Sequence, residues 1–387
     1  MQRLDRPLST FIAFLAAWLA GMAHLWADEA QTLTVVTWGG AYEASQKAAI
    51  FEPFTEATGI SLEIVRYDGG IQALRDHLAE EAKPSWDVID MVSAEASVAC
   101  EAGLLERFDP ALLAPAPDAT PAADDFVEGA FGDCSVAQLL FATVIAYDDR
   151  AFPGEKPQDV ADFFDLERFP GKRALRAAPD GLFDWALRAY GVPRSQIYDL
   201  LSTERGFDLA FRQLDRIRDE LLWWQGGDEP VALLRDGEAA MVTGYNGRFF
   251  HAQAVNGLPI SVIWDSALLE HASWAIMKGT SKKELAERFI RFATESEQLA
   301  AMANRISYGP ARRSAMRRVG LHVETGVPMA PHMPTAPPHL AQALHKDQSW
   351  YAKTADLRHR RFEAWLNRHF QEGAPVRETV PSAGKDP

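Results

Sequence analysis

The sequence contains little of what enzymes use for catalysis. It has only two cysteines, and it contains no G-x-S-x-G nucleophile motif, phosphate-binding glycine loop or H-E-x-x-H zinc motif. The histidines lack a spacing that would place two ligands on one helix face. Cys100 lies among Glu95, Glu101 and Glu106, which disfavour a thiolate nucleophile. The sequence therefore predicts no catalytic residues, no metal site and no cofactor.

Basic residues are also in short supply. Lysine and arginine number 39 against 54 acidic residues, which gives a net charge of −15. A chain this acidic repels phosphates, so a nucleic-acid partner is not expected. The balance is compatible with a cationic solute, although ordinary solubility explains much of it.

Long apolar runs are missing except at the N-terminus. Arg3 and Arg6 precede the run PLSTFIAFLAAWLAGMA, which is short for a membrane span and is followed by a plausible cleavage point at Ala27. Residues 1–27 are predicted to be a secretory signal, and the protein is expected in a bacterial periplasm. In such an oxidising compartment a disulfide between Cys100 and Cys134 is favoured, with two buried thiols as the alternative.

The rest of the chain alternates between strand and helix patterns. Residues 33–109 read as β-α-β-α-β-α, which predicts a mostly parallel sheet covered on both faces. Two long β-rich runs, 138–148 and 259–279, flank a second α/β region. This pattern predicts two lobes joined by crossing strands, and residues 374–387 are expected to be disordered.

Aromatic residues gather at strand ends and turns. Trp38 is followed by Gly39, Gly40 and Tyr42, a turn where glycines let the backbone approach a ligand. Further turns of this kind contain Trp224, Gln225, Tyr245, Asn246, Arg248 and Tyr308. Each aromatic alone is more often a core residue. Together, in two lobes, they favour a ligand cleft, since aromatic faces bind alkyl chains and amines.

Several segments together resemble a known family. They are TWGGAYEASQKAAIFEPFTEATG, WDVIDMVSAEASVACEAGLLE, FATVIAYD, FPGKRALR, LLRDGEAAMVTGYNGR, WAIMKG and SYGPARRSA, in this order. From about Leu33 to Asn367 the chain resembles periplasmic solute-binding proteins of ABC importers, in the spermidine/putrescine-binding branch.

The resemblance implies an α/β, two-lobed periplasmic-binding-protein fold of type II with two crossover hinge segments. The first lobe would comprise residues 28–144 and 271–311, and the second 145–270 and 312–373. A monomer would capture a small solute between the lobes and deliver it to the ABC permease. The resemblance also implies cleft roles for Trp38, Tyr42, Tyr245 and Tyr308, and it strengthens the disulfide interpretation.

The chain departs from polyamine binders in its acidic residues. Asp180 and Glu270 remain as candidate counter-charges for an amine, but Ala272 replaces a second acid, and Arg248 adds a cation. Burying an amine without a carboxylate partner is costly in free energy. An amino-acid-like or zwitterionic solute, whose carboxylate Arg248 would bind, is therefore the alternative to a polyamine-like solute. Two other classes stay open: a thiaminase-like enzyme on the same scaffold, and an adaptor with no ligand.

Overall fold

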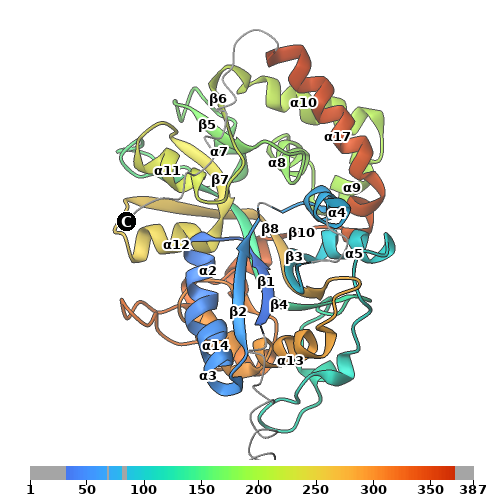
Figure 1. Ribbon diagram of the computed structural model, residues 1–387. Helices are drawn as coiled ribbons and strands as arrows, with labels where there is room; N and C mark the ends of the chain where they lie inside the picture. The colour runs from blue at the N-terminus through green and yellow to red at the C-terminus, as the bar shows by residue number, and fades with distance from the viewer. Residues whose placement is uncertain (1–31, 68, 81–84, 371–387) are drawn as a thin grey trace, which may run out of the picture.

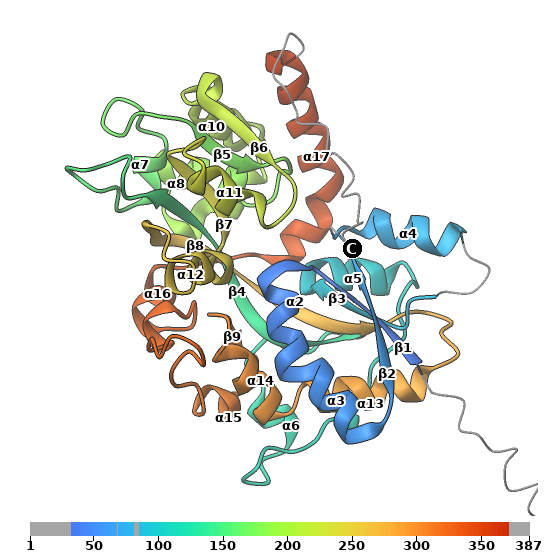
Figure 2. The same cartoon turned by 60° about the vertical axis from the view of Figure 1, so that its left-hand side comes forward.

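Two long antiparallel strands cross the molecule and connect its two lobes. The computed structural model describes residues 32–67, 69–80 and 85–370. In it, β4 (Ser135–Asp148) pairs with β8 (Ile260–Ile276) along most of their length. Figures 1 and 2 show one lobe at each end of this pair. The two predicted crossing runs are confirmed.

All strands belong to one sheet, whose main order is β2-β1-β3-β8-β4-β7-β5-β6. The shorter strands are β1 (Thr32–Thr37), β2 (Ser61–Arg66), β3 (Val88–Val92), β5 (Arg173–Arg176), β6 (Leu221–Trp224), β7 (Met241–Tyr245), β9 (Gly309–Pro310) and β10 (Leu344–His345). Strands β1 to β3 are parallel in the first lobe, and β5 to β7 are parallel in the second. β9 pairs with β4, and β10 pairs with β8.

Helices cover both halves of the sheet (Figure 1). The first lobe contains α2 (Gly40–Gln46), the π-helical η1 (Lys47–Phe51), α3 (Glu52–Thr58), α4 (Ile71–Glu80), α5 (Ser93–Glu101), η2 (Pro110–Leu112), α6 (Ala122–Asp125), α13 (Lys283–Ala293) and α14 (Ser296–Ala303). The second contains α7 (Val160–Phe163), α8 (Leu182–Ala189), η3 (Arg194–Gln196), α9 (Ile197–Leu201), α10 (Glu204–Asp215), η4 (Arg218–Glu220), α11 (Glu229–Arg235) and α17 (Gln348–Phe370). The remaining helices are α12 (Asn246–Ala254), α15 (Arg313–Met316), η5 (Ala330–His332) and α16 (Pro337–Gln342).

Helical periodicity explains how the covering helices pack. In α13 the buried residues Ala286, Phe289, Ile290 and Ala293 follow a spacing of three and four, so they share one face. β1 is instead buried on both faces, as expected for a strand inside a parallel sheet.

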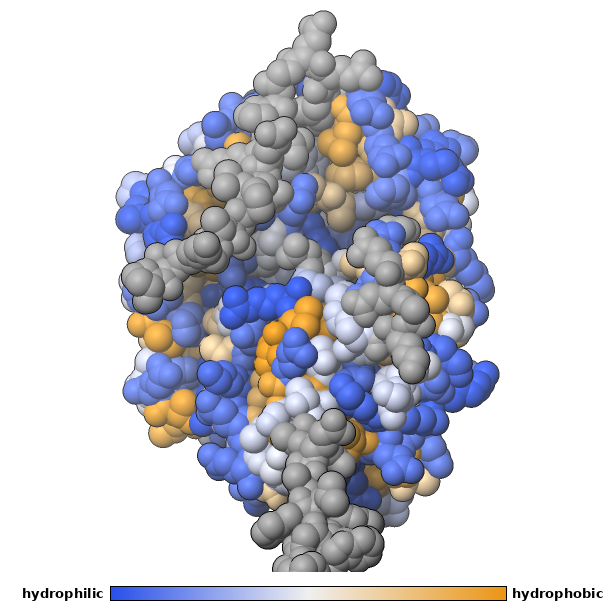
Figure 3. Space-filling model, in the orientation of Figure 1, coloured by the Kyte–Doolittle hydropathy of each residue, from blue (hydrophilic) through white to orange (hydrophobic). Residues whose placement is uncertain are grey.

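The outer surface is largely hydrophilic, as Figure 3 shows for one face. Within the described residues no helix has the length and apolarity needed to cross a membrane. The predicted signal at 1–27 and the predicted tail at 374–387 lie outside the described residues, and the lobe boundaries stay predictions.

Cys100 and Cys134 form the predicted disulfide. The bond ties the end of α5 to the residue that precedes β4, across a sequence separation of 34. Closing a loop of this length restricts the unfolded chain by about 3–4 kcal/mol. We expect the double Cys100→Ser, Cys134→Ser variant to lose about this much stability in denaturant unfolding. A reductant should lower wild-type stability similarly and leave the double variant unchanged; equal stability of the two proteins would contradict the assignment.

Candidate functional site

Two connected cavities lie between the lobes. The larger has a volume of about 380 Å³ and the smaller about 60 Å³. They share Val92, Phe141, Arg176 and Tyr245, so they form one continuous cleft. Charged side chains from both lobes line the larger cavity, and aromatic and aliphatic side chains make up most of the lining of the smaller one.

The topology places the cleft at the carboxyl ends of parallel strands. Trp38 directly follows β1, Glu95 lies in the first turn of α5 after β3, Arg176 ends β5 and Tyr245 ends β7. Ligands of open α/β sheets bind at such strand ends. The cleft therefore occupies the position that this sheet topology favours.

Aromatic rings build the smaller cavity. Trp38 and Tyr67 lie with ring centroids 4.8 Å apart, and Tyr42 and Tyr308 5.6 Å apart. The Tyr42 hydroxyl donates a 2.6 Å hydrogen bond to the buried carboxylate of Asp90. These rings offer flat apolar walls to the alkyl part of a solute.

The Trp38-Gly39-Gly40 turn contacts an ion pair from the second half of the chain, in which the arginine is buried and the aspartate is exposed. Arg248 pairs with Asp228, and its guanidinium also reaches the carbonyls of Trp38 and Gly39 at 3.4 and 3.5 Å. Gly40 has a φ of +64°, and a Cβ there would lie 2.5 Å from the guanidinium. The glycine thus permits this close approach. The charge of Arg248 is already neutralised by Asp228.

Asp90 beneath the aromatic cavity is fully buried, and burial raises its pKa to about 7, although hydrogen bonds from Tyr42 and Gln46 lower it. Between about pH 4 and pH 7 the folded protein therefore keeps a proton on Asp90 that the unfolded chain has already released. This contribution to stability is complete below pH 4 and is lost as the pH rises to 7.

Asp90→Asn removes the ionisable group, so the variant should not show this fall in stability. Relative to wild type, its free energy of unfolding should increase by a few kcal/mol between pH 5 and pH 8, since each pKa unit corresponds to about 1.4 kcal/mol. Denaturant unfolding at several pH values measures the difference between the two proteins. Parallel pH profiles would contradict the assignment.

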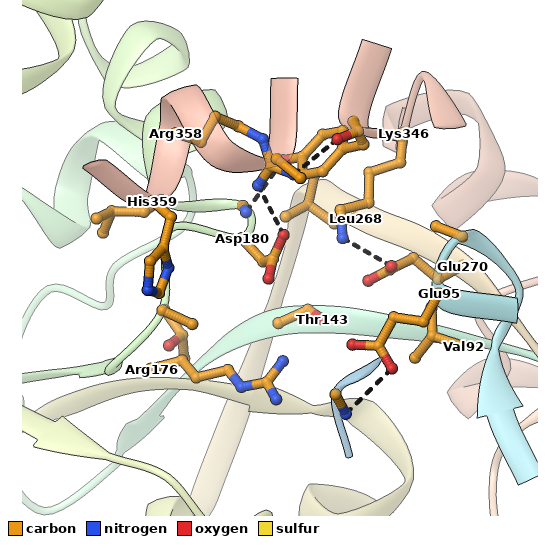
Figure 4. A pocket seen from close by; sticks show the side chains of 18 of the residues that line it. Val92, Glu95, Thr143, Arg176, Asp180, Leu268, Glu270, Lys346, Arg358 and His359 are labelled. Atoms are coloured by element: carbon orange, nitrogen blue, oxygen red, sulfur yellow. Dashed lines mark hydrogen bonds and ion pairs between the residues drawn. The ribbon is translucent and has the colours of Figure 1, made fainter. Parts of the chain in front are cut away.

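Two ion pairs occupy part of the larger cavity (Figure 4). Lys346 Nζ lies 2.7 Å from Glu270 Oε1, and Arg358 Nη1 lies 2.9 Å from Asp180 Oδ1. Burial raises the pKa of Asp180, but Lys346 and Arg358 outweigh this effect and hold it below its usual range. Both predicted counter-charges are therefore paired with cations of the protein itself.

Two opposite charges in the same cavity form no salt bridge with any residue that the structure describes. The side chain of Arg176 makes no hydrogen bond or salt bridge with the described residues, and Figure 4 shows its guanidinium in the cavity. In the described part of the chain the Glu95 side chain accepts one hydrogen bond, at 3.3 Å, from the Gly70 N–H. Burial raises the pKa of Glu95, while Arg176 lowers it. Arg176 belongs to the second lobe and Glu95 to the first (Figure 1).

Most of the predicted cleft residues line the two cavities. The smaller is lined by Trp38, Tyr42, Gln225, Tyr245, Arg248 and Tyr308, and the larger by Asp180, Trp224, Tyr245 and Glu270. Gly39 and Asn246 line neither. The Asn246 side chain instead accepts a hydrogen bond from the Ala142 N–H and donates one to the Ser307 carbonyl. These bonds hold the start of α12 in position.

Sequence reasoning missed four charged residues of the larger cavity, namely Glu95, Arg176, Lys346 and Arg358. Arg176 and Glu95 could have been found, because one ends a predicted strand and the other opens the helix after a strand. Lys346 and Arg358 come from the C-terminal segment, whose position over the cavity no local pattern indicates.

The disulfide bears on the enzyme alternative. The sulfur of Cys100 is bonded to that of Cys134, so it is not available as a thiol nucleophile. A thiaminase-like mechanism through this cysteine is incompatible with the structure.

Comparison with known proteins places the chain in a family. Residues 49–335 match the family model described as bacterial extracellular solute-binding protein. A gamma-aminobutyric acid-binding protein from Pseudomonas aeruginosa is 34% identical over 352 residues, covering 90% of this chain and 96% of the relative.

Solved structures agree with this match. The PBP MotA from A. tumefaciens B6, in complex with glucopine, aligns with a TM-score of 0.78 and 27% identity, covering 87% of this chain and 99% of MotA. A GABA receptor structure aligns with a TM-score of 0.72 and 27% identity, covering 88% of this chain and 98% of the receptor. The homologues are solute-binding proteins rather than enzymes, and this chain belongs to the bacterial extracellular solute-binding protein family.

Proposed function

We propose that this protein is the periplasmic binding component of an ABC importer and that it captures a small zwitterion carrying one carboxylate and one ammonium group. The observation that carries the proposal is the pair of opposite charges at one cavity, Arg176 and Glu95, which form no salt bridge with the described residues. The bound solute would then be handed to the membrane permease.

The two charges suit the two ends of an amino acid. A guanidinium binds a carboxylate through two parallel hydrogen bonds, and a carboxylate accepts charge-assisted hydrogen bonds from an ammonium. The alkyl part of the solute would lie against Phe141, Trp224 and Tyr245, which line the same cavity. A monocation would leave Arg176 unsatisfied, and a monoanion would leave Glu95 unsatisfied.

The position of the charges also offers a reason for closure. Because Arg176 and Glu95 come from different lobes, a zwitterion that bridges them makes both contacts only when the lobes are close together. A solute that binds the closed form better shifts the population toward it. Closure would in turn present both lobes to the permease.

The relatives support a solute of this class. The Pseudomonas aeruginosa relative and the GABA receptor are named for gamma-aminobutyric acid, an ω-amino acid. A polyamine-like solute is less well supported, because Asp180 and Glu270, the carboxylates expected to hold its amines, are already paired with Arg358 and Lys346.

A thermal-shift screen of the purified protein tests the proposed class. The panel comprises 4-aminobutanoate, α-amino acids, betaines, putrescine, spermidine, sugars and thiamin. A solute that binds the folded protein raises its melting temperature. We expect shifts with zwitterionic amines and none with sugars. A shift confined to putrescine and spermidine would contradict the proposal, and so would flat curves across all zwitterions.

A further inference from the structure

Lys346, from the C-terminal part of the chain, places its ammonium group at the larger cavity. It directly follows β10, which pairs with Leu268 and Leu269 of β8, so the main chain is held beside Glu270. The side chain of Lys346 is 8% exposed and that of Glu270 is 11% exposed. The ammonium therefore lies almost entirely inside the protein, although the cavity is open to solutes.

The surroundings of this ammonium are those of an amine-binding site. Its nitrogen lies 2.7 Å from Glu270 Oε1 and 4.4 Å from the centroid of the Tyr351 ring. A carboxylate combined with an aromatic face is the arrangement that recognises alkylammonium ligands. Burial lowers the pKa of Lys346, but Glu270 and Asp180 outweigh it and raise the pKa, so the group stays charged.

The site is continuous with the proposed solute site. Glu270 and Lys346 line the same cavity as Glu95 and Arg176, and Figure 4 shows all four around one space. A chain carrying an ammonium at each end would meet two carboxylates there, Glu95 and Glu270. Within the described residues Glu270 forms a salt bridge with Lys346 and Glu95 forms none, although Arg176 acts on Glu95 electrostatically.

We propose that Lys346 is a tethered occupant of a second amine subsite, formed by Glu270 and the face of Tyr351, and that it thereby sets specificity. With the subsite filled, the protein accepts solutes with one ammonium and rejects diamines. The existence of the subsite does not depend on the function proposed above, whereas its role in specificity rests on that function.

Chemical rescue tests the subsite directly. Lys346→Ala removes three methylenes and the ammonium, a loss that n-propylammonium can fill. We expect n-propylammonium to raise the melting temperature of Lys346→Ala by several degrees in a saturable manner, and to leave wild type unchanged. The double variant Lys346→Ala, Glu270→Gln should show no rescue, and 1-propanol should rescue neither variant. Equal responses of Lys346→Ala and wild type would overturn the proposal, as would rescue by 1-propanol or rescue of the double variant.

A refolding assay covers the case in which Lys346→Ala does not stay folded. Refolding from urea should then be restored by n-propylammonium and not by 1-propanol; failure of n-propylammonium to restore it overturns the subsite.

Calorimetry tests the role in specificity. Putrescine should bind Lys346→Ala at least 10-fold more tightly than wild type, and no gain overturns that role. Failure of the wild type to bind 4-aminobutanoate would refute the proposed function, and with it the role in specificity, but not the subsite, because the rescue experiment involves no zwitterion.

Discussion

Replacing Arg176 by methionine is expected to weaken the binding of 4-aminobutanoate by roughly 30-fold to more than 1000-fold, as measured by isothermal titration calorimetry. Removing one partner of a buried, hydrogen-bonded charge pair costs about 2–5 kcal/mol, and each 1.4 kcal/mol is a factor of ten in affinity. Arg176 is the expected partner of the solute carboxylate because its side chain forms no salt bridge with the described residues, although the carboxylates of Asp180, Glu95 and Glu270 act on it from a distance. Methionine keeps the apolar stem and removes only the charge.

Arg235→Met is the matched control. Arg235 ends α11 in the same lobe, and its exposed side chain pairs with the neighbouring Asp236. This variant should bind 4-aminobutanoate like wild type. If Arg176→Met and Arg235→Met both retained wild-type affinity, Arg176 would not be the carboxylate-binding group.

Glu95→Gln is expected to have an effect of similar size, roughly 30-fold or more, because the solute ammonium would lose its counter-charge. It should also change the pH dependence. The pKa of Glu95 is raised above its usual value, mainly by burial. Protonation of Glu95 removes its negative charge, so wild-type affinity should fall as the pH is lowered from 7.5 toward 5. The glutamine variant should bind weakly and show no such fall.

Glu101→Gln provides the control for this experiment. Glu101 is the last residue of the same helix α5, and it is exposed. Calorimetric titrations at pH 5, 6 and 7.5 compare the three proteins. A wild-type affinity that stays constant across this range, together with a Glu95→Gln affinity near that of wild type, would exclude Glu95 as the ammonium-binding group.

Much of the fold follows from local sequence patterns. The runs around Gln138–Asp148 and Ile260–Ile276 are long and rich in β-forming residues, and both became the strands that cross between the lobes. The strand–turn–helix pattern around Trp38 placed that residue at a strand end, and it lines the cleft. Such patterns depend on periodicity within one segment, which is why they could be read without a structure.

The charge balance of the site could not be predicted in the same way. Asp180 and Glu270 lie in the larger cavity as expected. The cations that pair with them are distant in the sequence: Arg358 lies 178 positions after Asp180, and Lys346 lies 76 positions after Glu270. The sequence made Arg248 a candidate for binding the carboxylate of the solute, but Arg248 pairs with Asp228, which belongs to another segment. Which cavity charges form salt bridges depends on tertiary pairing, and within the described residues that pairing leaves Arg176 and Glu95 without one.

The most direct test of the central claim is a calorimetric comparison of 4-aminobutanoate, butanoate and butylammonium with the wild-type protein at pH 7.5. These probes share a four-carbon chain and differ in their terminal charges. We predict that 4-aminobutanoate binds, and that losing either charge weakens binding by at least 30-fold, since each loss leaves Arg176 or Glu95 in the cavity without its partner on the solute. Butylammonium or butanoate binding as tightly as 4-aminobutanoate would contradict the account.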